Sequence, residues 1–200
     1  MPDCVVDLFV EDRAHEEFLV AMLHRIGVEE GVSVATRVRS ARGGHARAVG
    51  EYELYQRLLK SASLPGGVPD VVVVGIDGNC RTAAVKRGEI LAATRGALVG
   101  RVVCACPDPH IERWYLSDPE SFRTVVGSRP AVKRKKCQRG YYKSLLSDSV
   151  RDAGGLPLLG GIEFARDIVA AMDLYRAGRN DRSLKAFVDS LRAALRRQHA

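Results

Sequence analysis

The first half of the chain alternates short apolar segments with longer segments in which apolar residues recur at helical spacing. The apolar segments predict strands at 5–10, 32–38, 71–75 and 101–106, and the amphipathic segments predict helices at 14–26, 51–59 and 81–95. Strands that alternate with helices in this way form a mostly parallel sheet with helices on both faces. We therefore expect an α/β fold built on a mostly parallel four-stranded sheet.

The pattern changes after Pro107, where strand-like segments stop. Helical spacing predicts helices at 111–116, 119–126, 141–150, 164–172 and 183–195. In the last of these, apolar residues from Leu184 to Leu195 fall on one face, as in a helix that packs on a core. We expect residues 1–118 to form the α/β domain and residues 119–200 to form a helical C-terminal extension packed on it.

Three carboxylates follow predicted strands. Glu11 comes directly after the first strand, Asp77 follows the strand that ends near Ile76, and Glu112 lies just past the strand 101–106. In an open parallel sheet the active crevice lies outside the carboxyl ends of the strands. The sequence therefore predicts that Glu11, Asp77 and Glu112 share a metal site, although an acid at a strand end can also simply cap the next helix.

The charge of the chain indicates a polyanionic partner. It carries 31 Lys and Arg against 24 Asp and Glu, a formal net charge of +7, and the excess is concentrated in short segments such as 37–47 and 133–143. A basic protein with acids at strand ends suits a metal that joins those acids to nucleic acid. We expect the nucleic acid to contact Lys133, Arg134, Lys135, Lys136 and Lys143, next to the aromatic rings of Tyr141 and Tyr142. The alternative for this basic run is a solvated surface.

The cysteine content and the length of the apolar segments bear on localisation. No apolar segment reaches the roughly 20 residues that span a bilayer, so we expect no membrane association. The N-terminus has no basic region before its apolar segment, which argues against a signal peptide. An odd cysteine count without a secretion signal predicts a cytoplasmic protein with free thiols, with Cys80 of special interest because it closely follows Asp77.

The strand-end motifs resemble those of the Toprim family, which includes primases, topoisomerases and OLD-family nucleases. The first motif is Leu8-Phe9-Val10-Glu11-Asp12 and the second is Val74-Gly75-Ile76-Asp77-Gly78-Asn79. The segment 111–118, IERWYLSD, resembles one in small Toprim-like bacterial proteins that are often encoded beside ABC-type or AAA-type ATPases. The resemblance covers residues 5–118 and implies a Toprim-like fold, with an ATPase as a possible partner.

The resemblance also implies the roles of the site residues. Glu11 would ligate a metal or act as general acid or base, and Asp77 would ligate Mg²⁺ or Mn²⁺. Asn79 stands where the family has a second aspartate, and its amide oxygen can still bind a metal, although without charge. Another acid would then compensate, and Glu112, Asp12 and Asp118 are the candidates. The predicted metal ligands are thus Glu11, Asp77, Asn79 and Glu112, and the predicted catalytic residues are Glu11, Asp77 and Glu112.

These features lead to three functional hypotheses. The first is a metal-dependent nuclease that acts in anti-phage defence. The second is a non-catalytic Toprim-like module that binds nucleic acid or a partner ATPase, which the neutral Asn79 favours. The third is a doubly wound nucleotide-binding protein, which is disfavoured because no glycine-rich phosphate loop follows the first strand.

Overall fold

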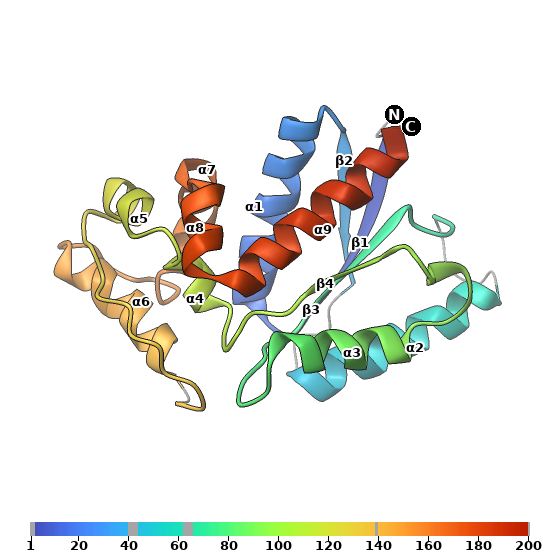
Figure 1. Cartoon of the computed structure of the whole chain (residues 1–200), viewed down its shortest axis with the longest axis horizontal. Helices are drawn as coiled ribbons and strands as arrows, with labels where there is room; N and C mark the ends of the chain where they lie inside the picture. The colour runs from blue at the N-terminus through green and yellow to red at the C-terminus, as the bar shows by residue number, and fades with distance from the viewer. Residues whose placement is uncertain (1–2, 40–43, 62–65, 139, 200) are drawn as a thin grey trace.

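The computed structural model describes residues 3–39, 44–61, 66–138 and 140–199. Its centre is a four-stranded sheet in the order β2-β1-β3-β4, in which every neighbouring pair is parallel (Figure 1). The strands are β1 (Cys4–Val10), β2 (Val34–Val38), β3 (Val71–Gly75) and β4 (Val102–Ala105). The predicted α/β class and the mostly parallel sheet are therefore confirmed. Most of the predicted loop 40–44 lies outside the described residues.

Helices connect the strands and continue beyond the sheet. The connecting helices are α1 (Arg13–Glu30), α2 (His45–Lys60) and α3 (Ala83–Ala93), followed by the short 3-10 helix η1 (Gly96–Leu98). After β4 come α4 (Glu112–Tyr115), α5 (Pro119–Val126), α6 (Tyr141–Asp152), the 3-10 helix η2 (Ile162–Phe164), α7 (Ala165–Ala171), α8 (Leu174–Asn180) and α9 (Arg182–His199). Helix α8 is not predicted by the sequence pattern because this short helix has few apolar residues. The side chain of Asp173 caps it by accepting from the backbone N–H groups of Tyr175 and Arg176.

The strands are apolar on both sides because each face of the sheet carries a hydrophobic core. On β1, Leu8 and Val10 face the core shared with α1 and α9, whereas Phe9 faces the core shared with α2. Side chains of a strand alternate between faces, so a strand buried on both faces reads as a continuous apolar run. This is why the strands were visible in the sequence.

The strand order reverses direction between β1 and β3. The chain passes from β1 to β2 on one side and from β3 to β4 on the other, so the connections that follow β1 and β3 diverge. Ligands of open α/β sheets bind at such a switch point, outside the carboxyl ends of the strands. Glu11 and Asp77 lie at this point.

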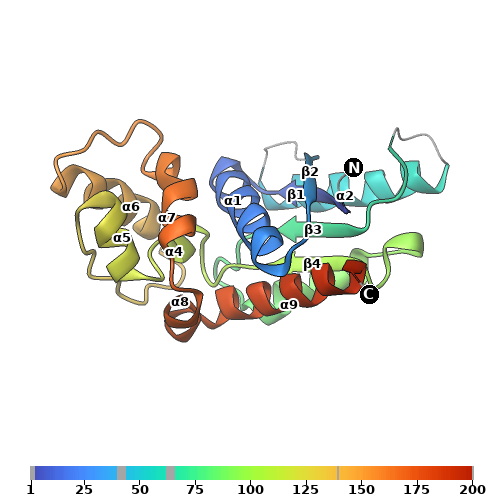
Figure 2. The ribbon, with the colours of Figure 1, turned by 90° about the horizontal axis from the view of Figure 1, so that it is seen from above.

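The helices after β4 form an extension that returns to the sheet. Figure 2 shows α4, α5, α6 and α7 at one end of the molecule, while α9 runs back alongside β4. Their apolar residues share one core with α1 and one face of the sheet. Arg25 on α1 also donates hydrogen bonds to the carbonyl oxygens of Val169 and Met172 (2.6 and 2.5 Å). None of the helices in the described ranges has the length and apolar character needed to cross a membrane.

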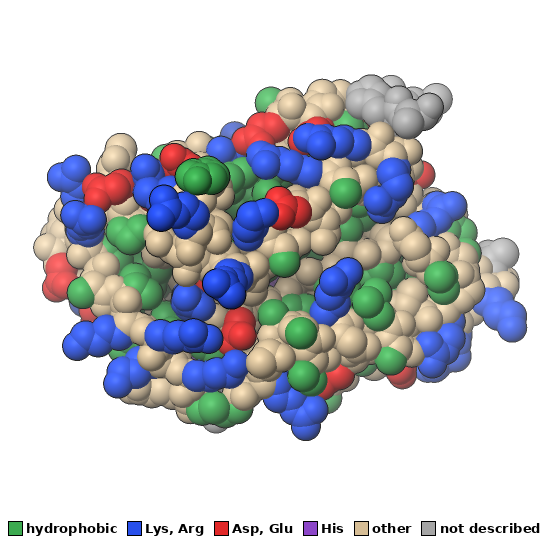
Figure 3. Space-filling model, in the orientation of Figure 1, with side chains coloured by type: hydrophobic (Ala, Val, Ile, Leu, Met, Phe, Trp, Pro, Cys, Tyr) green, Lys and Arg blue, Asp and Glu red, His purple; other side chains and the backbone are tan. Residues whose placement is uncertain are grey.

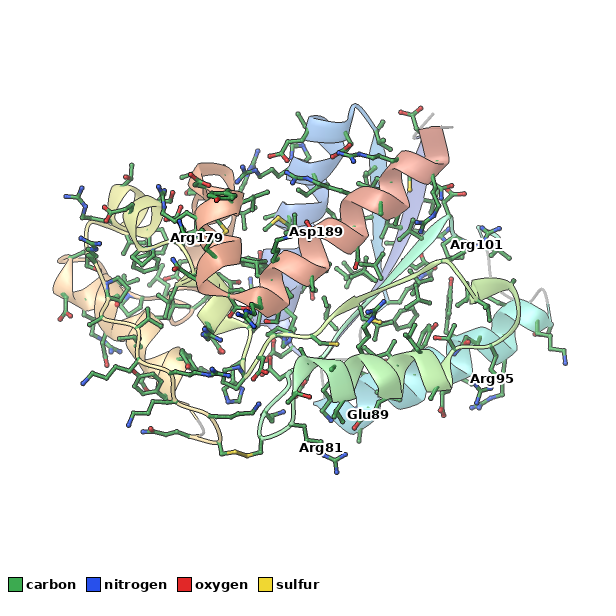
Figure 4. The ribbon with its side chains drawn as sticks, in the orientation of Figure 1. Arg81, Glu89, Arg95, Arg101, Arg179 and Asp189 are labelled. Atoms are coloured by element: carbon green, nitrogen blue, oxygen red, sulfur yellow. A yellow bond between two sulfur atoms is a disulfide. The ribbon has the colours of Figure 1, made fainter. Side chains whose placement is uncertain are left out.

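The expectation that all cysteines are free thiols is wrong for two of them. Cys80 and Cys137 form a disulfide, with their Cα atoms 4.7 Å apart (Figure 4). The sequence could not show this pair because 57 positions separate the two residues and only the fold brings them together. Cys4, Cys104 and Cys106 are free.

A buried carboxylate fastens the extension to the segment after α4. Asp118 is 1% exposed and accepts hydrogen bonds from the Arg176 guanidinium, the Ser121 hydroxyl and the Asp173 backbone N–H. Burial acts to raise the pKa of Asp118, but the hydrogen bonds from Arg176, Ser121 and Asp173 outweigh it and lower this pKa to about 2.

Asp118 should therefore make stability depend on acid pH. Its folded pKa lies below its unfolded value, so its contribution is complete above about pH 4 and is lost as the pH falls toward about 2. We expect Asp118→Asn to lower the free energy of unfolding at pH 7 by on the order of 2 kcal/mol. The pH dependence between pH 4 and 2 should also flatten, as measured by urea unfolding.

The control is Asp148→Asn, which removes an ion pair with Arg151 whose two side chains are both 60% exposed. Exposed pairs contribute little, so this variant should unfold like the wild type. Equal acid sensitivity of Asp118→Asn and the wild type would contradict the assignment.

Candidate metal centre

Glu11 connects the ends of the two central strands. Its backbone N–H donates to the carbonyl oxygen of Gly75 at the end of β3 (3.1 Å), and its carboxylate Oε2 accepts from the backbone N–H of Asp77 (3.0 Å). The side chain is half-buried. Glu11 is therefore held beside Asp77 even without a ligand.

Asp77 is the most heavily contacted acid at this edge of the sheet. It is 7% exposed, and its Oδ1 accepts from the backbone N–H of Ile111 (2.9 Å) while its Oδ2 lies 2.9 Å from Nδ1 of His110. A carboxylate only accepts, so Nδ1 of His110 carries the proton in this contact. The segment after β4 thus holds the carboxylate that follows β3.

His15 completes the group from the first turn of α1. Its side chain is fully buried, with Nδ1 2.8 Å from Oδ1 of Asp12, which caps the same helix. Its Nε2 lies 3.1 Å from Oδ1 of Asp77 but makes no hydrogen bond to any described residue. At this distance the buried ring is paired with the Asp77 carboxylate by charge, and Nε2 could ligate a metal only after losing its proton.

Gly75 allows α1 to come this close to the sheet. A Cβ at this position would lie 2.7 Å from Cδ1 of Leu19 and 3.5 Å from the His15 ring. Contacts under about 3 Å force the neighbour to move, so a larger residue would displace the Leu19 side chain from its place against β3. The glycine at the end of β3 therefore belongs to the site as much as the acid that follows it.

One ligand atom each from Glu11, His15 and Asp77 lies within 4.8 Å of the other two. Two carboxylates and an imidazole suit a divalent transition metal. Mg²⁺ takes oxygen ligands, so the histidine nitrogen favours Mn²⁺ over Mg²⁺. The residues present therefore fit such an ion.

Burial and charge shift the pKa values of these groups in opposite directions. Burial acts to lower the pKa of His15, but Asp77 and Asp12 outweigh it and raise this pKa well above its ordinary value. Burial acts to raise the pKa of Asp77, but His15 and His110 hold it below its ordinary value. The negative charge of Asp77 is therefore paired with the positive charge of the His15 ring.

The structure places the other predicted site residues at different distances from this group. Glu112 is the first residue of α4 and is half-buried. Burial raises the pKa of Glu112, and the charge of Asp77 raises it further, so Glu112 lies within electrostatic reach of Asp77.

Asn79 is exposed, with φ +53°, and its backbone N–H donates to the carbonyl oxygen of Pro109 (2.8 Å). Its side chain makes no hydrogen bond to Glu11, His15 or Asp77 in the described structure. Asp118 is occupied by Arg176, as shown above.

The basic segment 133–136 is tied to the segments that follow β3 and β4. Cys137, directly after it, is bonded to Cys80, three positions past Asp77, and Lys136 pairs with Asp108 (3.1 Å). The hydroxyl of buried Tyr142 accepts from the backbone N–H of Lys135 (3.0 Å), and the backbone N–H of Lys133 donates to Tyr141 (3.4 Å). The two tyrosines therefore hold the segment in place. Lys143 lies exposed on α6.

His15 and His110 lie at the site but are not among the site residues predicted from the sequence. His15 carries a usable signal, because it follows Glu11 by four positions and so lies in the first turn of the helix after the strand. His110 lies beside Glu112 in the sequence, which allows a ligand or a proton shuttle, but its approach to Asp77 depends on how the segment after β4 folds. Comparison of the chain with family models, with curated proteins and with solved structures finds no match, so the resemblance to Toprim stays a prediction.

The metal centre predicts stabilisation by Mn²⁺. At about 100 times its dissociation constant an ion adds about 2.7 kcal/mol, which raises Tm by about 5–10 °C for a chain of this size. We expect this shift in the wild type by differential scanning fluorimetry, and we expect Glu11→Gln, His15→Gln and Asp77→Asn each to remove most of it. Asp148→Asn should keep the full shift. An undiminished Mn²⁺ shift in all three site variants would place the ion elsewhere.

Proposed function

We propose that the protein is a metal-dependent nuclease that cleaves phosphodiester bonds. The observation that carries this proposal is the convergence of Glu11, His15 and Asp77 at the switch point of the sheet, beside a segment rich in lysine and arginine. The first feature suits a divalent cation and the second suits a polyanion. Nucleic acid is a substrate that needs both.

Each residue would have a distinct role in this chemistry. Glu11, His15 and Asp77 would hold the ion, which when bound supplies Lewis acidity and lowers the pKa of a water. The raised pKa of Glu112 suits a group that donates a proton to the leaving oxygen. His110 orients the Asp77 carboxylate through its Nδ1–H, as outer contacts of metal ligands commonly do.

The wider setting follows from the resemblance to Toprim proteins. A nuclease of that kind would work in the cytoplasm as an effector of anti-phage defence, beside an ABC-type or AAA-type ATPase. The substrate would be DNA or RNA, with Mg²⁺ or Mn²⁺ as cofactor. The surface residues Lys133, Arg134, Lys135, Lys136 and Lys143 would contact its phosphates.

A second candidate is a non-catalytic module that binds nucleic acid or the ATPase. Asn79 favours it, because an amide in place of an acid leaves the site with one negative charge fewer than the family motif. The contacts of the Asp77 carboxylate with His110 and Ile111 would also suit a residue that only stabilises the fold.

Cleavage assays with labelled DNA and RNA, in Mn²⁺ and in EDTA, separate the two candidates. A nuclease should lose about 100-fold or more of its rate in Glu11→Gln and in Asp77→Asn, because each change removes a charge that the ion needs. Binding of nucleic acid should persist in both variants. No cleavage by the wild type in any divalent metal, together with no gain in Asn79→Asp, would leave the binding module as the function.

The basic segment predicts a strong salt dependence of nucleic-acid binding. Each lysine or arginine that neutralises a phosphate adds about 0.7–0.9 to the slope of log K against log salt. Replacing Lys133, Arg134, Lys135 and Lys136 by alanine should therefore lower the slope by about 3 in a filter-binding titration. Removing Arg57 and Lys60, at the end of α2 remote from the site, should leave it unchanged. Identical slopes for the two variants would identify the segment as a solvated surface.

A further inference from the structure

A groove runs along the free edge of the sheet, separate from the metal centre. It has a volume of about 1010 Å³ and lies between α3 and α9, with Cys104 and Cys106 from β4 and its end on the floor. In Figure 1 the edge of β4 is visible between these two helices, and Figure 3 shows the same face. Because β4 is the last strand in the order, no described strand covers this edge.

The floor of the groove offers backbone groups that pair with no described strand. The backbone N–H of Val72 donates to the carbonyl oxygen of Arg101, and that of Ile76 donates to the carbonyl oxygen of Ala105. Backbone groups alternate along a strand, so those of Val103 and Ala105 point toward β3. The N–H and C=O groups of Val102 and Cys104 must then point away from β3, toward the open side. An edge of this kind is a template for one more strand.

The walls leave room for a backbone to approach. Small residues line both helices: Ala83, Ala84 and Gly88 on α3, and Ser183, Ala186 and Ser190 on α9. A Cβ on Gly88 would meet nothing within 4 Å. The groove is therefore wide enough at this point for an extended chain.

The charge of the groove selects an acidic occupant. Five arginines line it against two aspartates, Asp108 and Asp181, and these aspartates are already paired with Lys136 and Arg113. The remaining arginines are exposed and have no acidic partner among the described residues: Arg87, Arg134, Arg179 and Arg182. Figure 4 shows Arg179 at α8, near the start of α9, and Lys and Arg side chains outnumber acidic ones on this face (Figure 3).

The geometry points to a docking site for an extended acidic peptide that adds to β4 as a fifth strand. A peptide matches the alternating donors and acceptors of Val102 and Cys104, and its carboxylates pair with the arginines of the walls. A nucleic-acid strand fits less well, because its phosphates only accept hydrogen bonds and would face the carbonyl oxygens of β4. The partner is thus a protein segment with acidic residues at alternate positions, all of which face one arginine-bearing wall of the groove.

Fluorescence anisotropy can test this site without any metal. The probe is a fluorescein-labelled octapeptide pool with glutamate at alternate positions and a mixture of valine, threonine and alanine between them. With EDTA present, it should bind at least tenfold more tightly than the same pool with lysine in place of glutamate. Equal binding of the two pools, or tighter binding in the groove by a labelled oligothymidylate, would overturn the proposal.

A matched pair of glycine variants locates the binding. Gly88→Trp fills the groove from α3, whereas Gly50→Trp puts the same ring on α2, where a Cβ also meets nothing within 4 Å. Gly88→Trp should weaken the peptide at least tenfold, Gly50→Trp should not, and Arg87→Ala should weaken it several-fold. Undiminished binding to Gly88→Trp would overturn the site.

Amide exchange followed by NMR tests the strand addition itself. Saturating peptide should slow exchange of the Val102 and Cys104 amides by at least tenfold, because these groups gain hydrogen bonds. Val103 and Ala105 already bond to β3 and serve as internal references. Unchanged exchange at Val102 and Cys104 would show that the peptide does not pair with the edge. Because no step uses the metal centre, failure here is distinguishable from failure of the nuclease proposal.

Discussion

The arrangement of the site depends on one buried charge, the carboxylate of Asp77. Burying an unpaired carboxylate is costly, so the fold must bring donors to it. The donors His110 and Ile111 come from the segment after β4, and the His15 ring on the first turn of α1 pairs with the carboxylate by charge at 3.1 Å. Glu11 in turn accepts from the backbone of Asp77 itself. One side chain thus fixes the relative positions of the segments that follow β1, β3 and β4.

The same network extends to the helix caps. Asp12 both caps α1 and accepts from His15, so this histidine lies between two carboxylates. Burial acts to raise the pKa of Asp12, but its contacts with His15 lower it to about 2. The charge at the end of β3 is therefore coupled to the start of α1, and a change in either acid alters the surroundings of the same ring. Such coupling holds ligand atoms in place before any ion arrives.

The sequence predicts the sheet and the acids at the strand ends more completely than it predicts the other residues of the site. Four apolar runs predict the strands because both faces of the sheet are buried, and the position of an acid after a strand predicts the edge at which it lies. The place of His15 depends on how closely α1 approaches Gly75, which no periodicity reveals. The exposure of Asn79 depends on a left-handed backbone, which asparagine tolerates but does not require.

The helical extension contributes to both candidate sites. The turn after Asp77 lies close to the segment after β4, since Gly78 donates to the carbonyl oxygen of Pro107 (2.8 Å) and a Cβ there would lie 2.8 Å from the same atom. From that contact the chain passes through His110 and Glu112 at the metal centre, and later supplies Arg134 and Arg179 to the groove. Helix α9 then returns beside β4 and forms a wall of that groove. Residues beyond the sheet therefore complete the crevice at the strand ends and leave the neighbouring edge of β4 open. An occupant of the groove would contact the segment after β4, which also holds Asp77.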